Sequence, residues 1–176
     1  MRSIASAGAP VNVTAGNRDF LLGARFAEAA GATLLAEQTV IDLAGTPTLL
    51  LHGDELCTAD ADYQRYRRIA RNARYQRAFL AFPYPWRRRV ASLMRRKSAS
   101  STAIKAEAIM DVEQRAVEQA FRAAKVTRII HGHTHRPAHH RLTVDGRECE
   151  RWVLADWYGR GSYLEFDDNG GRTREV

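Results

Sequence analysis

Apolar and polar positions alternate along the chain in short segments, and the period of the alternation separates strands from helices. Eight short runs rich in apolar and β-branched residues predict strands. They are residues 11–15, 39–43, 48–51, 126–130, 140–144, 150–154, 163–166 and 172–176. Turn-forming residues at 44–47, 145–146 and 168–171 predict that three pairs of these strands form hairpins.

Longer segments with an apolar period of three to four residues predict helices. They are residues 20–30, 60–82, 87–97 and 105–124. Gly31 would end the first helix, Pro83 and Pro85 would separate the second from the third, and small polar residues at 98–102 predict a hinge. We therefore expect one α/β layered domain over residues 1–176, with the helices of residues 60–105 inserted in it.

The first residues resemble the end of a helix rather than a natural start. Residues 6–10 have small residues, a glycine and a proline, which is typical of a last helical turn that leads into the strand at 11–15. Residues 1–9 lack the basic start and apolar core of a signal peptide, and no run approaches the ~18 apolar residues that span a bilayer. We expect that a segment precedes this chain in the natural protein.

Charge is concentrated in one segment. The net charge is +7, and residues 65–97 contain twelve arginines and lysines, no acid and six aromatic residues. Such a segment suits an anionic membrane surface, an anionic ligand or nucleic acid, and it is equally typical of a solvated helical face. The two cysteines, Cys57 and Cys149, form no motif and are expected to be reduced structural thiols.

Metal-ligating residue types follow three of the predicted strands. His131, His133 and His135 follow the strand at 126–130, His52 follows the strand at 48–51, and Asn17 follows the strand at 11–15. Imidazole is the commonest transition-metal ligand, and α/β sheets place their sites at the carboxyl ends of strands. Taken alone, the histidine cluster or His52 is also compatible with a structural role. Convergence of the three strand ends is what predicts one shared metal centre.

Four blocks in this order resemble the calcineurin-like metallophosphoesterases, and more closely their UDP-2,3-diacylglucosamine diphosphatase branch in lipid A biosynthesis. The blocks are Gly16-Asn17-Arg18-Asp19-Phe20-Leu21-Leu22-Gly23, His52-Gly53-Asp54-Glu55-Leu56-Cys57-Thr58, Ala108-Ile109-Met110-Asp111-Val112 and His131-Gly132-His133-Thr134-His135-Arg136-Pro137. General metallophosphoesterases carry a histidine after Gly-Asn, whereas Arg18 stands here, as it does in the lipid A enzymes. The resemblance implies a layered β-sandwich with flanking helices and an inserted helical lid at residues 60–105.

The resemblance also implies the site residues and the reaction. The metal ligands would be Asn17, His52, His133 and His135, for a pair of Mn²⁺ ions, with His131 outside the metal shell. The substrate-binding residues would be Asn17, Arg18, Asp60, Ser98, Thr102, Lys105 and His133, and no catalytic acid or base is assigned. The expected reaction hydrolyses the pyrophosphate of UDP-2,3-diacylglucosamine to UMP and 2,3-diacylglucosamine 1-phosphate. The enzyme would be peripheral on the cytoplasmic face of the inner membrane, bound to anionic lipid and not to nucleic acid.

The chain departs from the family at its N-terminal side. Family members begin with an Asp-x-His strand and a second strand that ends in Gly-Asp, whose aspartate bridges both metals, and neither block is present. About two strand–helix units, or ~60 residues, would be absent, which would leave the second metal poorly held. Two other functions therefore stay open. One is a non-catalytic remnant that binds anionic lipid or nucleic acid through its basic segment, and the other is a nucleotide phosphodiesterase.

Overall fold

The computed structural model describes residues 1–104, 111–159, 161–167 and 170–176, with the backbone alone for residues 97–104. The chain separates into two compact units. The first, here called the sheet unit, consists of Met1–Leu56 and Val112–Val176, and the second, the helical unit, consists of Cys57–Asp111. The role of residues 60–105 as a lid stays a prediction. Lys105 lies outside the described residues.

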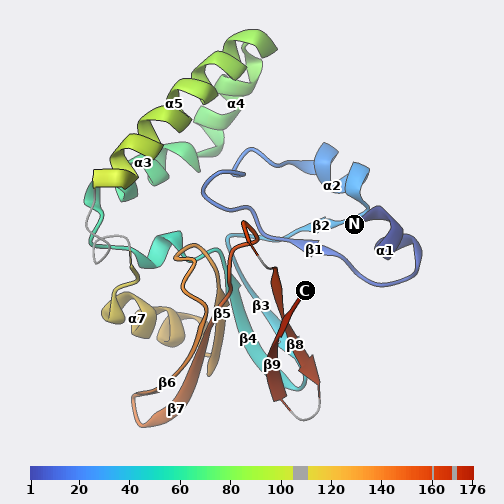
Figure 1. Cartoon of the computed structure of the whole chain (residues 1–176), viewed down its shortest axis with the longest axis vertical. Helices are drawn as coiled ribbons and strands as arrows, with labels where there is room; N and C mark the ends of the chain where they lie inside the picture. Colours follow the sequence, from blue (N-terminus) through green and yellow to red (C-terminus); the bar gives the residue numbers. More distant parts are fainter. Residues whose placement is uncertain (105–110, 160, 168–169) are drawn as a thin grey trace. The chain divides into compact units, whose positions relative to one another are not determined.

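A five-stranded mixed sheet organises the sheet unit (Figure 1). Its strands are β3 (Gln38–Leu43), β4 (Thr46–Leu51), β5 (Arg128–His131), β6 (Ala138–Val144) and β7 (Arg147–Val153), in the order β3-β4-β5-β7-β6. The three central strands β4, β5 and β7 are parallel, and an antiparallel hairpin partner flanks them on each side. Both hairpin turns have positive φ at two successive residues, Ala44-Gly45 and Asp145-Gly146, which matches the twist of hairpin strands. Two of the predicted hairpins are thereby confirmed.

One face of this sheet packs on helix α7 (Gln114–Ala124). Val117 and Phe121 on the helix and Leu49 and Ile129 on the strands are at most 1% exposed, and together they form the centre of the hydrophobic core. Of the predicted helix at 105–124, residues 105–110 lie outside the described residues. Helix α7 begins at Gln114, because Glu113 is extended (φ −82°, ψ 132°) and its amide donates to the Leu56 carbonyl at 2.9 Å. That bond fixes the entry of the chain into α7.

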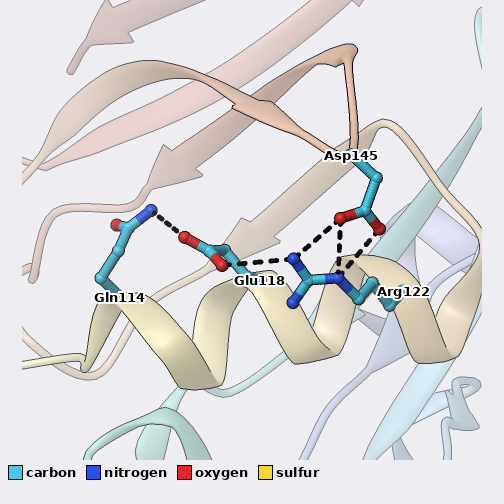
Figure 2. Close-up of polar contacts among 4 residues, drawn as sticks. All are labelled: Gln114, Glu118, Arg122 and Asp145. Carbon is cyan, nitrogen blue, oxygen red and sulfur yellow. Dashed lines mark hydrogen bonds and ion pairs between the residues drawn. The ribbon is translucent and has the colours of Figure 1, made fainter.

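A polar chain on the outer surface of α7 ties the helix to the β6–β7 turn (Figure 2). The Arg122 guanidinium donates two hydrogen bonds of 2.9 Å to the Asp145 carboxylate and one of 3.4 Å to Glu118. Gln114 extends the chain by donating to Glu118 at 3.2 Å. Because these groups are exposed, the ion pair contributes little stability, and its bidentate geometry mainly orients the helix on the sheet.

The opposite face of the sheet carries the third hairpin, formed by β8 (Ser162–Asp167) and β9 (Gly170–Glu175). Phe166 of this hairpin lies 4.6 Å below the Arg128 guanidinium and meets the Trp152 ring edge-on at 5.8 Å. Glu150 fixes the two residues that contact Phe166, since its carboxylate accepts a hydrogen bond from Arg128 and one of 3.1 Å from the Trp152 indole. His139 lies 2.9 Å from the same carboxylate and stacks on Trp152. The sequence predicted the hairpin of β8 and β9. It did not predict that Phe166 of this hairpin would contact Arg128 and Trp152.

The N-terminal part of the sheet unit is built from short elements. They are α1 (Arg2–Ser6), β1 (Asn12–Val13), α2 (Ala24–Ala30) and β2 (Thr33–Leu34), with β1 and β2 paired in parallel. Gly31 ends α2 in the left-handed conformation (φ 64°), as the sequence predicts. The helix begins at Ala24 rather than at residue 20, because residues 17–22 form turns that bring the chain out of β1.

The helical unit contains α3 (Ala61–Ala70), α4 (Ala73–Ala81) and α5 (Tyr84–Ile104). The predicted helix at 60–82 is divided in two, because the Asn72 side chain accepts from the Arg74 amide at 2.9 Å and starts a new helix there. Pro85 lies in the first turn of α5, where a missing amide hydrogen breaks no helical bond. The hinge predicted at 98–102 is wrong, since α5 continues through it to Ile104. None of the helices in the described ranges is long and apolar enough to cross a membrane.

The Glu150 cluster predicts an acid-sensitive contribution to stability. Burial raises the pKa of Glu150, but the hydrogen bond and charge of Arg128 and the hydrogen bonds of His139 and Trp152 outweigh burial and hold it below its usual 4.5. Because the pKa of this carboxyl group is lower in the folded chain, the group stabilises the fold at pH values above its unfolded-state pKa of 4.5. This contribution is lost as the pH falls through the lower, folded-state pKa. Glu150→Gln should lower the free energy of unfolding at pH 7 by about 1–2 kcal/mol and flatten its fall below pH 4.5.

Urea unfolding at a series of pH values measures both effects. Glu148→Gln is the matched control, because Glu148 lies on the same strand and is exposed. An unfolding free energy of Glu150→Gln that follows the unaltered chain at every pH would show that the carboxylate contributes nothing to holding the hairpin.

Candidate functional site

The carboxyl ends of three parallel strands meet at one edge of the sheet and carry the candidate site. In the ladder, Leu50 of β4 lies opposite Ile130 of β5, and His131 of β5 lies opposite Val153 of β7. Hydrogen bonds continue beyond the strand ends, because the Gly132 amide donates to the His52 carbonyl at 3.0 Å and the Leu154 amide donates to the His131 carbonyl at 2.8 Å. The loops that follow β4, β5 and β7 are therefore fixed side by side.

His131 is the structural histidine of this edge. It is 1% exposed, and both ring nitrogens have partners: Nδ1 lies 2.9 Å from the Gly132 carbonyl and Nε2 lies 2.9 Å from the Arg151 guanidinium. A guanidinium only donates, so Nε2 accepts and the proton sits on Nδ1. Burial lowers the pKa of His131 to about 4. The ring is therefore neutral, and both of its nitrogens have protein partners.

The two histidines that follow lie in an unusual stretch of backbone. The Thr134 amide donates to the Gly132 carbonyl at 2.9 Å, which closes a three-residue turn with His133 at its centre. His133 has φ 69° and His135 has φ 54°, in the left-handed region where residues with a β-carbon are uncommon. Backbone strain of this kind costs about 1–3 kcal/mol per residue and concentrates at functional sites.

His52 and His133 are brought together across the two loops. Their ring centroids lie 5.1 Å apart with the rings edge-on at 68°, and the Nε2 atom of His52 is buried. Gly16, at the end of β1, lies against the His52 ring, since a β-carbon there would be 2.8 Å from its Cε1 atom. This close approach brings the backbone next to Asn17 to His52. The third predicted strand end thus reaches the site.

His135 takes a different partner. Its Nδ1 atom lies 3.0 Å from the Asp156 carboxylate, which follows β7, and its ring centroid lies 6.0 Å from that of Tyr158. A metal-binding histidine commonly donates its second nitrogen to a carboxylate in this way, which leaves Nε2 for the ion. The structure places this pair beside the site but does not bring His135 into contact with His52.

The other predicted site residues are distributed over both units. Asn17 is half-buried, and Arg18 is exposed. Asp60 caps α3, and its carboxylate accepts from the Tyr63 amide at 3.0 Å. Ser98 and Thr102 lie on α5 in the stretch for which only the backbone is described, and Lys105 lies outside the described residues.

The residues predicted as metal ligands fit a metal ion only in part. Imidazole nitrogens and an amide oxygen are donors that a divalent transition metal accepts. His52 and His133 are in contact with each other, and Asn17 directly follows the glycine that touches His52. Within the described ranges, however, no group of three or more His, Cys, Asp or Glu side chains is arranged to hold an ion. The residues in contact suit part of the shell of one cation, and the full set of four ligands stays a prediction.

Two residues important for this geometry were not expected from the sequence. Arg151 holds the His131 ring, and Asp156 holds His135. Asp156 follows a strand next to β5, so the rule that selected His52 could have selected it had the place of β7 been known. Arg151 gives no such signal, because it lies inside a strand and its role depends on the register of β7 with β5.

Comparisons with known proteins place the chain among named hydrolases. No family model matches it. The chain is 49% identical over 170 residues to the UDP-2,3-diacylglucosamine hydrolase of Cellvibrio japonicus, which covers 97% of this chain and 71% of that protein. It is 46% identical to the protein of the same name from Serratia proteamaculans (94% of this chain, 69% of that protein) and 48% identical to the one from Nitrosococcus oceani (89% and 63%). The chain thus spans about two thirds of the length of these relatives.

The close contact between Gly53 and His131 predicts that no side chain is tolerated at residue 53. Gly53 has φ 108°, and a β-carbon there would lie 2.7 Å from the His131 Nδ1 atom and 3.1 Å from the Gly132 carbonyl. Gly53→Ala should therefore destabilise the chain by about 1–3 kcal/mol through the backbone conformation alone, and more through the clash. Thermal unfolding measures the loss.

Gly159→Ala serves as the control, because no neighbouring atom lies within 4 Å of a β-carbon there. Nuclear magnetic resonance signals of the His131 ring should shift in Gly53→Ala and stay in place in Gly159→Ala. If Gly53→Ala unfolds at the same temperature as the unaltered chain, the contact with His131 is not a constraint.

Proposed function

The chain belongs to the UDP-2,3-diacylglucosamine hydrolase family, and we propose that it hydrolyses the pyrophosphate bond of UDP-2,3-diacylglucosamine in lipid A biosynthesis. The products would be UMP and 2,3-diacylglucosamine 1-phosphate. The observation that carries the proposal for this chain is the contact between His52 and His133, at 5.1 Å between ring centroids, on two adjacent strand ends. The non-catalytic alternative is less favoured, since the relatives are named for the hydrolase activity.

We propose that the site acts with Mn²⁺ held by His52, His133, His135 and Asn17. Bound there, a divalent cation would lower the pKa of a water molecule and neutralise charge on the phosphoryl group. A second ion, as in a two-metal centre, would be held less well by these neutral ligands. Asp156 supports the role of His135, because its carboxylate fixes which nitrogen of that ring bears the proton.

The chain's own residues would bind and orient the substrate. Arg18 is exposed next to Asn17, and a planar guanidinium binds a phosphate in bidentate fashion. Neutral His131 keeps a proton on Nδ1 and holds Gly132 in place, which positions the turn that presents His133. Further substrate contacts in this proposal come from the helical unit, acting as a lid, through Asp60, Ser98, Thr102 and Lys105. The layered β-sandwich of the metallophosphoesterases is the fold that we propose for the chain.

Binding of Mn²⁺ tests the site without reference to activity. His133→Ala should weaken Mn²⁺ binding at least about tenfold, since even the loss of a supporting outer residue costs 10–100-fold. Electron paramagnetic resonance of free Mn²⁺ during a titration measures the affinity. His140→Ala is the matched control, because His140 is an exposed histidine on β6.

The two histidine variants should also differ in hydrolase activity. Release of UMP from UDP-2,3-diacylglucosamine should be lost in His133→Ala and kept in His140→Ala. Equal Mn²⁺ affinity of His133→Ala and the unaltered chain would exclude His133 as a ligand.

We also propose that the helical unit attaches the protein to anionic lipid on the cytoplasmic face of the inner membrane. Pro85, Arg88, Arg89, Ser92 and Arg96 line one shallow hollow on α5. Exposed apolar side chains lie on the same unit and suit the interface of a bilayer. They are Ile69, Phe82, Tyr84, Trp86, Leu93 and Met94.

Vesicle binding tests this attachment. Each arginine near an anionic surface contributes about 1 kcal/mol, so replacing Arg88, Arg89 and Arg96 by glutamine should weaken binding to phosphatidylglycerol vesicles by about a hundredfold. The control replaces the exposed arginines Arg115, Arg141 and Arg147 of the sheet unit, which changes the net charge equally. If both triple variants bind alike, attraction depends on total charge and not on this face of α5.

A further inference from the structure

The loop that follows β7 exposes two large aromatic rings beside the candidate site. Trp157 is 68% exposed and Tyr158 is 85% exposed, although side chains of this size are usually more buried. Both lie in the stretch 154–159, here called the aromatic loop, which leaves the sheet at the edge where His52 and His133 meet.

Trp157 is held in one orientation in spite of its exposure. Its indole nitrogen donates to the Ser162 carbonyl at 3.0 Å. One face of the ring packs on Gly161, because a β-carbon there would lie 3.2 Å from the Trp157 Cε3 atom. A flat ring that is fixed on one side and open on the other is a preorganised surface for stacking.

The aromatic loop is tied to the site by Asp156. The carboxylate of this residue lies 3.0 Å from His135, and the Tyr158 ring lies 6.0 Å from the same histidine. Trp157 therefore directly follows a residue, Asp156, that contacts His135. It also lines an apolar pocket of about 360 Å³ with Ile130, Leu154, Ser162 and Phe166.

We infer that Trp157 is the stacking platform for the nucleobase of the substrate, with Tyr158 beside it. This inference rests on the proposed function, in which the substrate is a uridine diphosphate ester. When a phosphate lies on the histidines, the covalent length of a nucleotide requires the base to lie near by. The acyl chains lie beyond the other phosphate, on the sugar, so the flat base is the part of the substrate next to a uridine phosphate that lies on the histidines. Base–aromatic stacking needs only a π-face, which the open side of Trp157 offers.

Binding of UMP and of ribose 5-phosphate, which lacks the base, tests the platform. Isothermal titration calorimetry of the 176-residue chain in Mn²⁺ buffer should show tighter binding of UMP than of ribose 5-phosphate. Trp157→Ala should weaken UMP binding about tenfold, the effect typical of losing one base–aromatic stack, and leave ribose 5-phosphate binding unchanged. Trp157→Phe keeps a flat ring and should retain most of the UMP affinity. Tyr75→Ala, which removes a ring that is 60% exposed on the helical unit, should change neither value.

The outcomes separate this inference from the function on which it rests. Unchanged indole signals of Trp86 and Trp152 in nuclear magnetic resonance spectra show that a variant is folded. If folded Trp157→Ala binds UMP as tightly as the unaltered chain, or if the unaltered chain binds UMP and ribose 5-phosphate equally, the inference is overturned and the proposed function stands. If the unaltered chain binds neither compound, the proposed function fails and the inference fails with it.

Discussion

Parallel pairing of β4 with β5 and of β5 with β7 is the constraint on which the candidate site depends. Parallel neighbours end at the same edge of a sheet, so the residues that follow them are brought together although they are far apart in sequence. His52, the loop that carries His133 and His135, and Asp156 all follow from this one arrangement. The hydrogen bonds from Gly132 to His52 and from Leu154 to His131 extend it into the loops. A shift of register in β5 would separate every one of these groups.

Close packing gives each histidine at the carboxyl ends of these strands a different chemical environment. Gly53 and Gly16 allow the backbone to approach His131 and His52 at distances that no side chain would permit. Buried His131, held between Arg151 and Gly132, stays neutral and supports the turn. His133 and His135 have left-handed backbone conformations, and they contact His52 and Asp156 respectively. Three histidines within five residues thus differ in chemistry because their neighbours in space differ.

Local rules predicted much of the fold and of the site. The strands of the five-stranded sheet, their hairpin turns at Ala44-Gly45 and Asp145-Gly146, and the end of α2 at Gly31 follow from turn residues and apolar periods, and the structure confirms them. The strand predicted at 11–15 is shorter, and β2 was not predicted. Helix limits were less accurate, because the Asn72 cap and the Glu113–Leu56 bond act through side-chain and backbone contacts that periodicity does not detect. The hinge expected at 98–102 was wrong, since small residues do not interrupt a helix that continues on both sides.

The sequence by itself determined the residue types and the strand ends that could form a site: Asn17, His52 and the three histidines after β5. Blocks of adjacent residues also determined the family, because motifs such as His-Gly-His-Thr-His are local and survive without any knowledge of the fold. Only the tertiary structure decided which side chains meet. It paired His52 with His133, gave His135 to Asp156, held His131 with Arg151, and left one face of Trp157 open. The physical reason is that these partners lie on different strands, and strand order and register are set by packing of the whole sheet rather than by neighbouring residues.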